Sequence, residues 1–248
     1  MTFFIVALFC YSFMQFIETV SFGSRLAGKL VNRLSLGTTL QNSIYVTSRL
    51  FLPPLLLSLS FLIESSLNIQ SFMLASMTLI IAALLTSLLV LINFNYFQLL
   101  FQSLFKQYEF NSIPIAIVKV LFGKKNKLNL VHLEVIPGIW SLSLKKILTS
   151  AVAYFFLSTG FLIAFGLAIL IPEYRMTVSQ SASAFHGIGA LTLALYIDPM
   201  ISRSLDTELQ NSKWLENIYS IFVGRLLAYL FALIMFLCLY SYTYTMPF

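Results

Sequence analysis

Long blocks of hydrophobic residues, interrupted at only a few positions by polar ones, alternate along this chain with shorter polar stretches. A helix needs about 20 residues to cross a hydrocarbon layer of about 30 Å. Six blocks reach this length, so the pattern predicts an all-α, polytopic bundle of about six transmembrane helices in a single transmembrane domain over residues 1–248. The predicted spans are residues 2–22, 34–63, 72–101, 147–171, 177–197 and 220–242.

The second and third blocks are longer than a straight crossing requires. Pro53 and Pro54 lie inside the second block. Because proline cannot donate a backbone hydrogen bond, we expect a break or kink there. The third block ends in Asn93, Asn95 and Gln98, which indicates a polar continuation of the helix beyond the membrane.

The composition agrees with a membrane protein, since 59% of the residues are hydrophobic and 10% are charged, against about 25% charged in a soluble domain. Cys10 and Cys238 both fall inside apolar spans, and we interpret them as small packing residues. The first block lacks a basic leader and is followed directly by Glu18, so we read it as a span and not as a cleaved signal peptide.

The net charge of +6 is distributed unevenly between the loops. Loops rich in lysine and arginine stay in the cytoplasm, so loops one, three and five are predicted to be cytoplasmic and both termini to lie outside. The basic residues are Arg25, Lys29 and Arg33 in loop one, Lys106, Lys119, Lys124, Lys125, Lys127, Lys145 and Lys146 in loop three, and Arg203 and Lys213 in loop five.

Loop three, residues 102–146, is a long basic cytoplasmic loop that contains an apolar segment at residues 113–122. That segment is too short to cross the membrane. We expect either a helix lying on the anionic cytoplasmic leaflet or a re-entrant segment, followed by the basic run at residues 124–127.

Arginines inside hydrophobic spans are the main candidates for function, because a cation in hydrocarbon costs about 2.5–3.5 kcal/mol. In the second span, Thr38, Asn42, Tyr45 and Arg49 share one face of a helix at 100° per residue. Two interpretations remain open. The stripe forms a hydrogen-bond network or ion pair that fixes helix packing, or it lines a polar cavity that binds a ligand.

Arg25 and Lys29 follow Glu18 on the predicted first helix, and Glu18 and Arg25 share a face if the helix is unbroken. One interpretation is a salt bridge together with ordinary positive-inside anchoring. The other is recruitment of a phosphate-bearing lipid headgroup at the cytoplasmic side.

The last two spans and the loop between them contain four further candidates. His186 is interpreted either as a histidine hydrogen-bonded between helices or as a proton-linked site. Asp198 precedes Pro199, which is typical of an N-cap followed by the first helical turn. Arg203 lies in loop five, and Arg225 either extends to water at the cytoplasmic end or points inward toward Arg49.

Enzymatic chemistry has little support in this sequence. No phosphate-binding loop, metalloprotease, nucleophile-elbow or paired-cysteine motif is present, and aspartate occurs only twice. We expect no cofactor, no metal site and no catalytic residue. The lysines of the loops are explained by membrane topology, so nucleic acid is not expected as a partner.

Two segments resemble signatures of the Amj family, the alternate lipid II flippases of bacteria. The first comprises residues 19–28 (TVSFGSRLAG), 33–36 (RLSL) and 46–49 (VTSR), and the second residues 197–203 (IDPMISR) and 222–225 (FVGR). The six-span layout with a long middle loop also resembles that family. The resemblance implies a location in the bacterial inner membrane and the transport of lipid II, an undecaprenyl-diphosphate-linked peptidoglycan precursor, to the outer leaflet during cell-wall synthesis.

The residues fit such a substrate, because the planar fork of arginine matches phosphate oxygens. The implied mechanism is alternating access through a basic intramembrane cavity without ATP hydrolysis. Arg25 and Lys29 would capture the headgroup, Asn42, Tyr45 and Arg49 would hold it midway, and Arg203 and Arg225 would complete the basic ring. Two alternatives are a carrier for another anionic lipid or solute and a non-catalytic membrane scaffold for cell-wall assembly.

Overall fold

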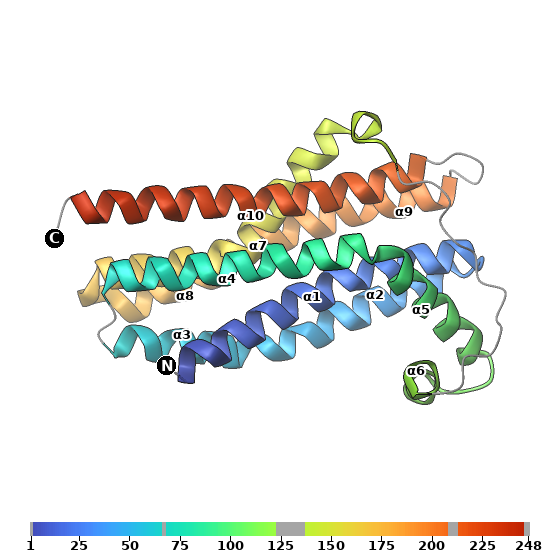
Figure 1. Ribbon diagram of the computed structural model, residues 1–248, viewed down its shortest axis with the longest axis horizontal. Helices are drawn as coiled ribbons and strands as arrows, with labels where there is room; N and C mark the ends of the chain where they lie inside the picture. Colours follow the sequence, from blue (N-terminus) through green and yellow to red (C-terminus); the bar gives the residue numbers. More distant parts are fainter. Residues whose placement is uncertain (1, 66–67, 123–136, 208–212, 246–248) are drawn as a thin grey trace.

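The structure is a computed structural model that describes residues 2–65, 68–122, 137–207 and 213–245 (Figure 1). Every regular element in these ranges is helical. The long helices are α1 (Thr2–Leu30), α2 (Leu34–Ser48), α3 (Leu52–Glu64), α4 (Ile69–Ile92), α5 (Phe94–Tyr108), α6 (Ile113–Phe122), α7 (Leu144–Leu170), α8 (Arg175–Thr192), α9 (Asp198–Thr207) and α10 (Lys213–Thr245). The short ones are the 3₁₀ turns η1 (Arg49–Phe51), η2 (Ile139–Ser141) and η3 (Pro172–Tyr174) and the π-helical turn η4 (Leu193–Ile197).

Six of the helical stretches in the described ranges are long and apolar enough to cross a membrane, which confirms the predicted polytopic helical bundle. They are α1, the run from α2 to α3, α4, α7, the run from η3 into α9, and α10. The first span is longer than its hydrophobic block, because α1 continues past Gly23 as far as Leu30.

The second span changes conformation just before its two prolines. A single 3₁₀ turn, η1, separates α2 from α3, and Pro53 and Pro54 occupy the first turn of α3. Proline fits a first turn because the backbone N–H that it lacks would have no partner there. Arg49 therefore lies where the regular backbone hydrogen bonds of this span are interrupted.

The third span ends at Ile92, and Asn93 separates α4 from the amphipathic helix α5. The apolar segment of the middle loop forms α6, which is seen nearly end-on in Figure 1 and therefore crosses the long axis of the bundle. Its orientation relative to a membrane surface, interfacial or re-entrant, stays a prediction. The basic run at residues 124–127 lies outside the described residues.

The helices form two groups. The N-terminal group comprises α1, α2, α3, α5 and α6, and the C-terminal group comprises α7, α8, α9 and α10, while α4 packs against both groups and α3 also touches α7. Within each group, backbones approach closely at glycine. A Cβ atom on Gly37 of α2 would lie 2.7 Å from the carbonyl oxygen of Ser24 in α1, and one on Gly224 of α10 would lie 2.4 Å from that of Ile147 in α7.

Both termini lie at the same end of the bundle, on the left in Figure 1. The opposite end contains the end of α1, the start of α2, the start of α7, and α5, α6 and α9. Those segments contain most of the described lysines and arginines outside the bundle interior, including Lys29, Arg33, Lys106, Lys119 and Arg203. The charge distribution predicted from the loops therefore divides the folded molecule into a basic end and an end with the termini.

Candidate functional site

A layer of polar side chains begins midway along the bundle, where two apolar clusters meet, and extends along α1 toward the basic end. One cluster includes Met14 of α1 and Ala83 of α4, and the other includes Phe22 of α1 and Val90 of α4. The polar layer joins the two helix groups, and we call this region the central interface. It is defined by Gln15, Glu18, Arg25, Arg49, Tyr154, His186, Asp198, Arg225 and Tyr229.

Glu18 of α1 is the carboxylate at the centre of this interface. One of its oxygens lies 3.3 Å from Nη2 of Arg49, and the other lies 3.3 Å from Nη2 of Arg225. The Glu18 side chain is 5% exposed and that of Arg225 is 1% exposed. One carboxylate is thus shared by an arginine of the N-terminal group and an arginine of the C-terminal group.

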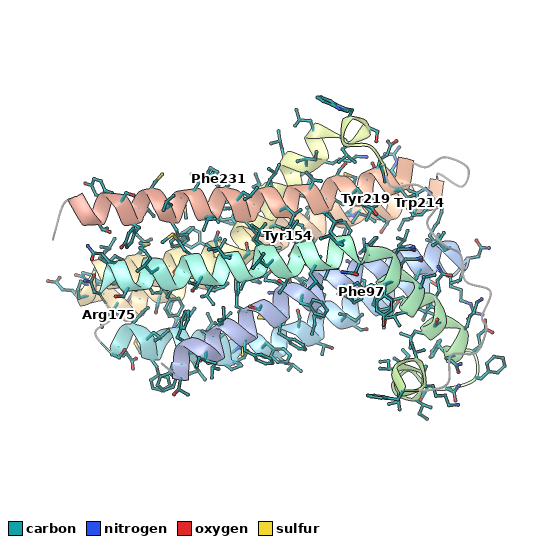
Figure 2. All side chains as sticks on the ribbon, in the orientation of Figure 1. Phe97, Tyr154, Arg175, Trp214, Tyr219 and Phe231 are labelled. Carbon is teal, nitrogen blue, oxygen red and sulfur yellow. The ribbon has the colours of Figure 1, made fainter. Side chains whose placement is uncertain are left out.

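Arg225 points into the bundle and does not extend to water, so the second of its two predicted orientations is the one observed. Its Nη2 donates to Oε1 of Gln15 at 2.6 Å, and its Nε donates to the hydroxyl of Tyr229 at 2.8 Å. The guanidinium carbon lies 4.6 Å from the ring centre of Tyr154, which Figure 2 shows near the middle of the bundle. Aromatic faces attract cations, so hydrogen bonds and a ring together hold this buried charge.

Arg49 is less enclosed, since 22% of its side chain is exposed. Its guanidinium lies 4.3 Å over the ring centre of Tyr45. Its Nη1 lies 2.9 Å from Nε2 of His186 in α8, and Nδ1 of His186 lies 3.3 Å from the carbonyl oxygen of Leu157. Because arginine only donates, Nε2 accepts and Nδ1 carries the ring hydrogen. A protonated His186 would present a second donor to Arg49 and lose this contact.

Arg25 and Asp198 form a second link between the groups. Nη2 of Arg25 lies 2.9 Å from Oδ1 of Asp198, and the Arg25 side chain is 2% exposed. Asp198 does not act as the predicted N-cap, because η4 continues into it with helical backbone angles and its carboxylate is used by Arg25. Nearby, the Lys29 ammonium donates to the carbonyl oxygen of Leu205 in α9.

The charges in the central interface do not balance. Arg25 and Asp198 cancel, whereas Glu18 is shared between Arg49 and Arg225, which leaves one positive charge in excess. Among the residues described, no hydrogen-bond partner reaches Nη1 of Arg225 or Nε and Nη1 of Arg25. Buried cations without full compensation favour an additional anion. The arrangement is therefore suited to exchange a carboxylate for a phosphate.

Two predicted residues lie away from this cluster. Asn42 is exposed on α2, and Arg203 is exposed on α9. Sequence reasoning also missed three members of the interface, Gln15, Tyr154 and Tyr229. A signal for two of them was available, because Gln15 lies on the same face of α1 as Glu18 and Arg25, and Tyr229 lies one turn after Arg225.

A large cavity outside the central interface is not basic. It measures about 690 Å³ and lies between α1, α2, α5 and α6, on the sides of α1 and α2 that face away from Glu18 and Arg49. Its lining is almost entirely apolar and includes Phe16, Ile44 and Ile117. The arginines of the central interface instead contact side chains of the protein itself. Among the residues described, no group of three or more His, Cys, Asp or Glu side chains is placed to hold a metal ion.

Comparisons with known proteins give one match. The family model Amj, described as "Alternate to MurJ", matches residues 11–243 of this chain. Neither the search of curated proteins nor the search of solved structures returned a match.

Proposed function

We propose a transport function for this chain, which belongs to the Amj family, "Alternate to MurJ". In the proposal, the protein moves lipid II from the cytoplasmic leaflet of the bacterial inner membrane to the outer leaflet. It forms and breaks no covalent bond. The chain is a multi-pass membrane protein by its six apolar helical stretches, and the proposal places both termini outside.

The observation that supports this proposal is the shared carboxylate. Glu18 contacts two arginines from opposite helix groups, each at 3.3 Å, and balances only one of their two charges. A lipid-linked diphosphate carries more negative charge than one carboxylate and offers more acceptor oxygens. Guanidinium groups bind phosphate oxygens in pairs. The diphosphate therefore competes with Glu18 for Arg49, the more exposed of the two arginines.

The proposed path uses the cytoplasmic contacts first. Arg25 and Lys29 meet the headgroup at the basic end, where their present partners are Asp198 and the carbonyl oxygen of Leu205. The headgroup then passes to Arg49 and Tyr45, and Arg225 compensates its charge from the other group. Exchange of partners across the central interface opens one side of the site as the other closes, as alternating access requires.

Asn42 and Arg203 have weaker positions in this proposal. Asn42 is exposed on α2 in the same span as Arg49, and Arg203 is exposed at the basic end of the bundle. Both fit early contact with a headgroup that arrives from the cytoplasmic leaflet. The polyprenyl chain remains in lipid throughout, because only the polar headgroup needs a path between the helices.

The test is restoration of lipid II exposure at the outer surface of cells whose own flippase has been shut off. The unmodified chain should restore exposure and survival. Arg49→Ala should reduce exposure at least tenfold while the protein inserts normally, because a lost charge-assisted contact to phosphate removes about 1.5–3 kcal/mol. Exposure is measured with a labelled reagent that binds lipid II outside the cell.

Arg33→Ala is the matched control. Arg33 is 42% exposed and pairs with Glu109 at the surface, outside the central interface, so exposure should stay within twofold of the unmodified chain. Normal exposure with Arg49→Ala at normal protein level would remove Arg49 from the site. Absence of exposure with an abundant, inserted unmodified chain would contradict lipid II as the substrate.

A further inference from the structure

A polar cleft of about 260 Å³ lies between α3, α7 and α8, and neither the family match nor the central interface accounts for it. Its polar lining comprises Ser60 and Glu64 of α3 and Arg175, Ser179 and Gln180 of α8. The remaining lining residues are Ile63, Phe165, Ala168 and Met176.

The cleft is at the end of the bundle that contains both termini. Figure 2 shows Arg175 at this end and Trp214 at the opposite, basic end. The cleft and the Arg49–His186 contact lie along the same pair of helical stretches, because both are formed between the second span, α2 to α3, and α8. A headgroup held at Arg49 would therefore meet this cleft next on its way toward the end with the termini.

Arg175 is incompletely bonded in the cleft. Its Nη1 donates to the carbonyl oxygen of Ile63 over a long 3.4 Å, and its Nε is buried without a hydrogen-bond partner among the described residues. A neutral carbonyl is a weaker partner for a guanidinium than a phosphate oxygen is. The amide of Gln180 and the hydroxyl of Ser60 add polar groups beside this cation.

We propose that this cleft is an outer contact site for the phosphate groups of the transported lipid, with Arg175 as its cation. The proposal rests on the transport function proposed above and adds a second binding position to it. The diphosphate leaves Arg49 and takes the place of the Ile63 carbonyl at Arg175 before the lipid enters the outer leaflet. Glu64 opposes this binding by repulsion and thereby promotes release.

The experiment measures protection of a cysteine placed in the cleft. In the full chain with Cys10→Ala and Cys238→Ala, Ser179→Cys is labelled from outside the cell by a membrane-impermeant maleimide. Farnesyl diphosphate, a short prenyl diphosphate, should slow the labelling about tenfold when it occupies the site. Inorganic diphosphate at the same concentration should slow it much less, because it lacks the chain that partitions into lipid.

Four substitutions in this background test which residues are responsible for the protection. Arg175→Gln should weaken the apparent affinity for farnesyl diphosphate about tenfold, the loss expected for one charge-assisted contact. Glu64→Gln should strengthen it a few-fold. Arg49→Ala and the control Glu173→Gln, at the same end but outside the cleft lining, should leave the protection unchanged.

Several results would overturn the assignment. These are labelling that occurs only from the cytoplasmic side, labelling that farnesyl diphosphate does not slow, and protection that survives Arg175→Gln. Equal protection by inorganic diphosphate would make the cleft a site for free phosphates and not for a lipid. Lipid II exposure measured in the same strains separates the two proposals. Protection without exposure contradicts only the proposed substrate, and exposure without protection contradicts only the cleft.

Discussion

Helices in this molecule meet in two different ways, within the helix groups and between them. Within the groups, glycine allows backbones to touch, as at Gly37 between α2 and α1 and at Gly224 between α10 and α7. Between the groups, α1 meets α7 and α10 through side chains. Some of these contacts pack aromatic rings, such as Phe22 on Phe222, and others use long polar side chains, such as Arg225 on Gln15 and Tyr11 on the Ser158 carbonyl. The two kinds of contact have different mechanical properties.

A contact between backbones has one geometry, because neither side can move without moving its helix. A contact between an arginine and a carboxylate can adopt many geometries, because both side chains can rotate and each side chain has other partners. Glu18, Arg49 and Arg225 already form a set in which one carboxylate serves two cations. The proposed alternating access would use this difference, with each group moving as a unit and the contacts of the central interface exchanging partners.

The largest effect is expected from a side chain added within a group. A Cβ on Gly224 would lie 1.8 Å from Oγ of Ser150 and 2.4 Å from the carbonyl oxygen of Ile147. Gly224→Val should therefore destabilise the fold by about 3 kcal/mol and remove most of the folded protein. Gly187→Ala is the control, because a Cβ there meets nothing within 4 Å. Protein abundance and thermal unfolding in detergent measure both, and a normal level of Gly224→Val would contradict the tight α7–α10 contact.

A charge change at the central interface should have an intermediate effect that can be reversed. Glu18→Gln leaves Arg49 and Arg225 without a counter-charge, so abundance should fall several-fold. The loss should be smaller than that of Gly224→Val, because Arg49 is 22% exposed and the glutamine still offers an acceptor oxygen to both arginines. Adding Arg49→Gln returns the cluster to its original charge and should restore abundance to within twofold. Lipid II exposure should be lost in both variants. If the second substitution fails to restore abundance, the Glu18–Arg49 contact is not the one that stabilises the interface.

The smallest effect is expected from one hydroxyl in the same network. The Tyr229 hydroxyl accepts from Nε of Arg225 at 2.8 Å and donates to Oε1 of Gln15 at 2.7 Å. Tyr229→Phe should cost about 1 kcal/mol and lower the Tm by about 2–4 °C. Tyr154→Phe, for which no hydroxyl bond is described, is the comparison and should shift the Tm less. Equal shifts would show that the two rings act only through packing.

The sequence predicted the bundle because an apolar block of about 20 residues has one stable arrangement in a bilayer. It also made Arg49 a candidate site residue, because a cation within a span requires a partner, and in the structure Arg49 contacts Glu18 and His186. The partners themselves were not predictable. Glu18 and Arg225 are 207 residues apart in the chain, and no local spacing rule connects them.

Local rules also failed where tertiary contacts compete with them. The pair Asp198-Pro199 matches a helix start, yet the backbone is already helical at Asp198 and Arg25 uses its carboxylate. The departure at Asp198 places a carboxylate beside Arg25 in the central interface, which a propensity argument does not take into account. The break expected from Pro53 and Pro54 is present, by contrast. It lies in the turn before them, Arg49–Phe51, because a proline removes the backbone hydrogen bond to the residue four positions earlier.

The π-helical turn η4 sets the phase of the fifth span. His186 and Asp198 are 12 residues apart, which in a regular α-helix would rotate them about 120° from each other. A π turn absorbs about one extra residue, so the two side chains return to within about 20° of a common face. A one-residue deletion inside Leu193–Ile197 would leave both in alignment with Arg49 and Arg25. The same deletion between Gly187 and Gly189 would rotate His186 and Asp198 apart, so this span tolerates a change of chain length at one place and not at its neighbour.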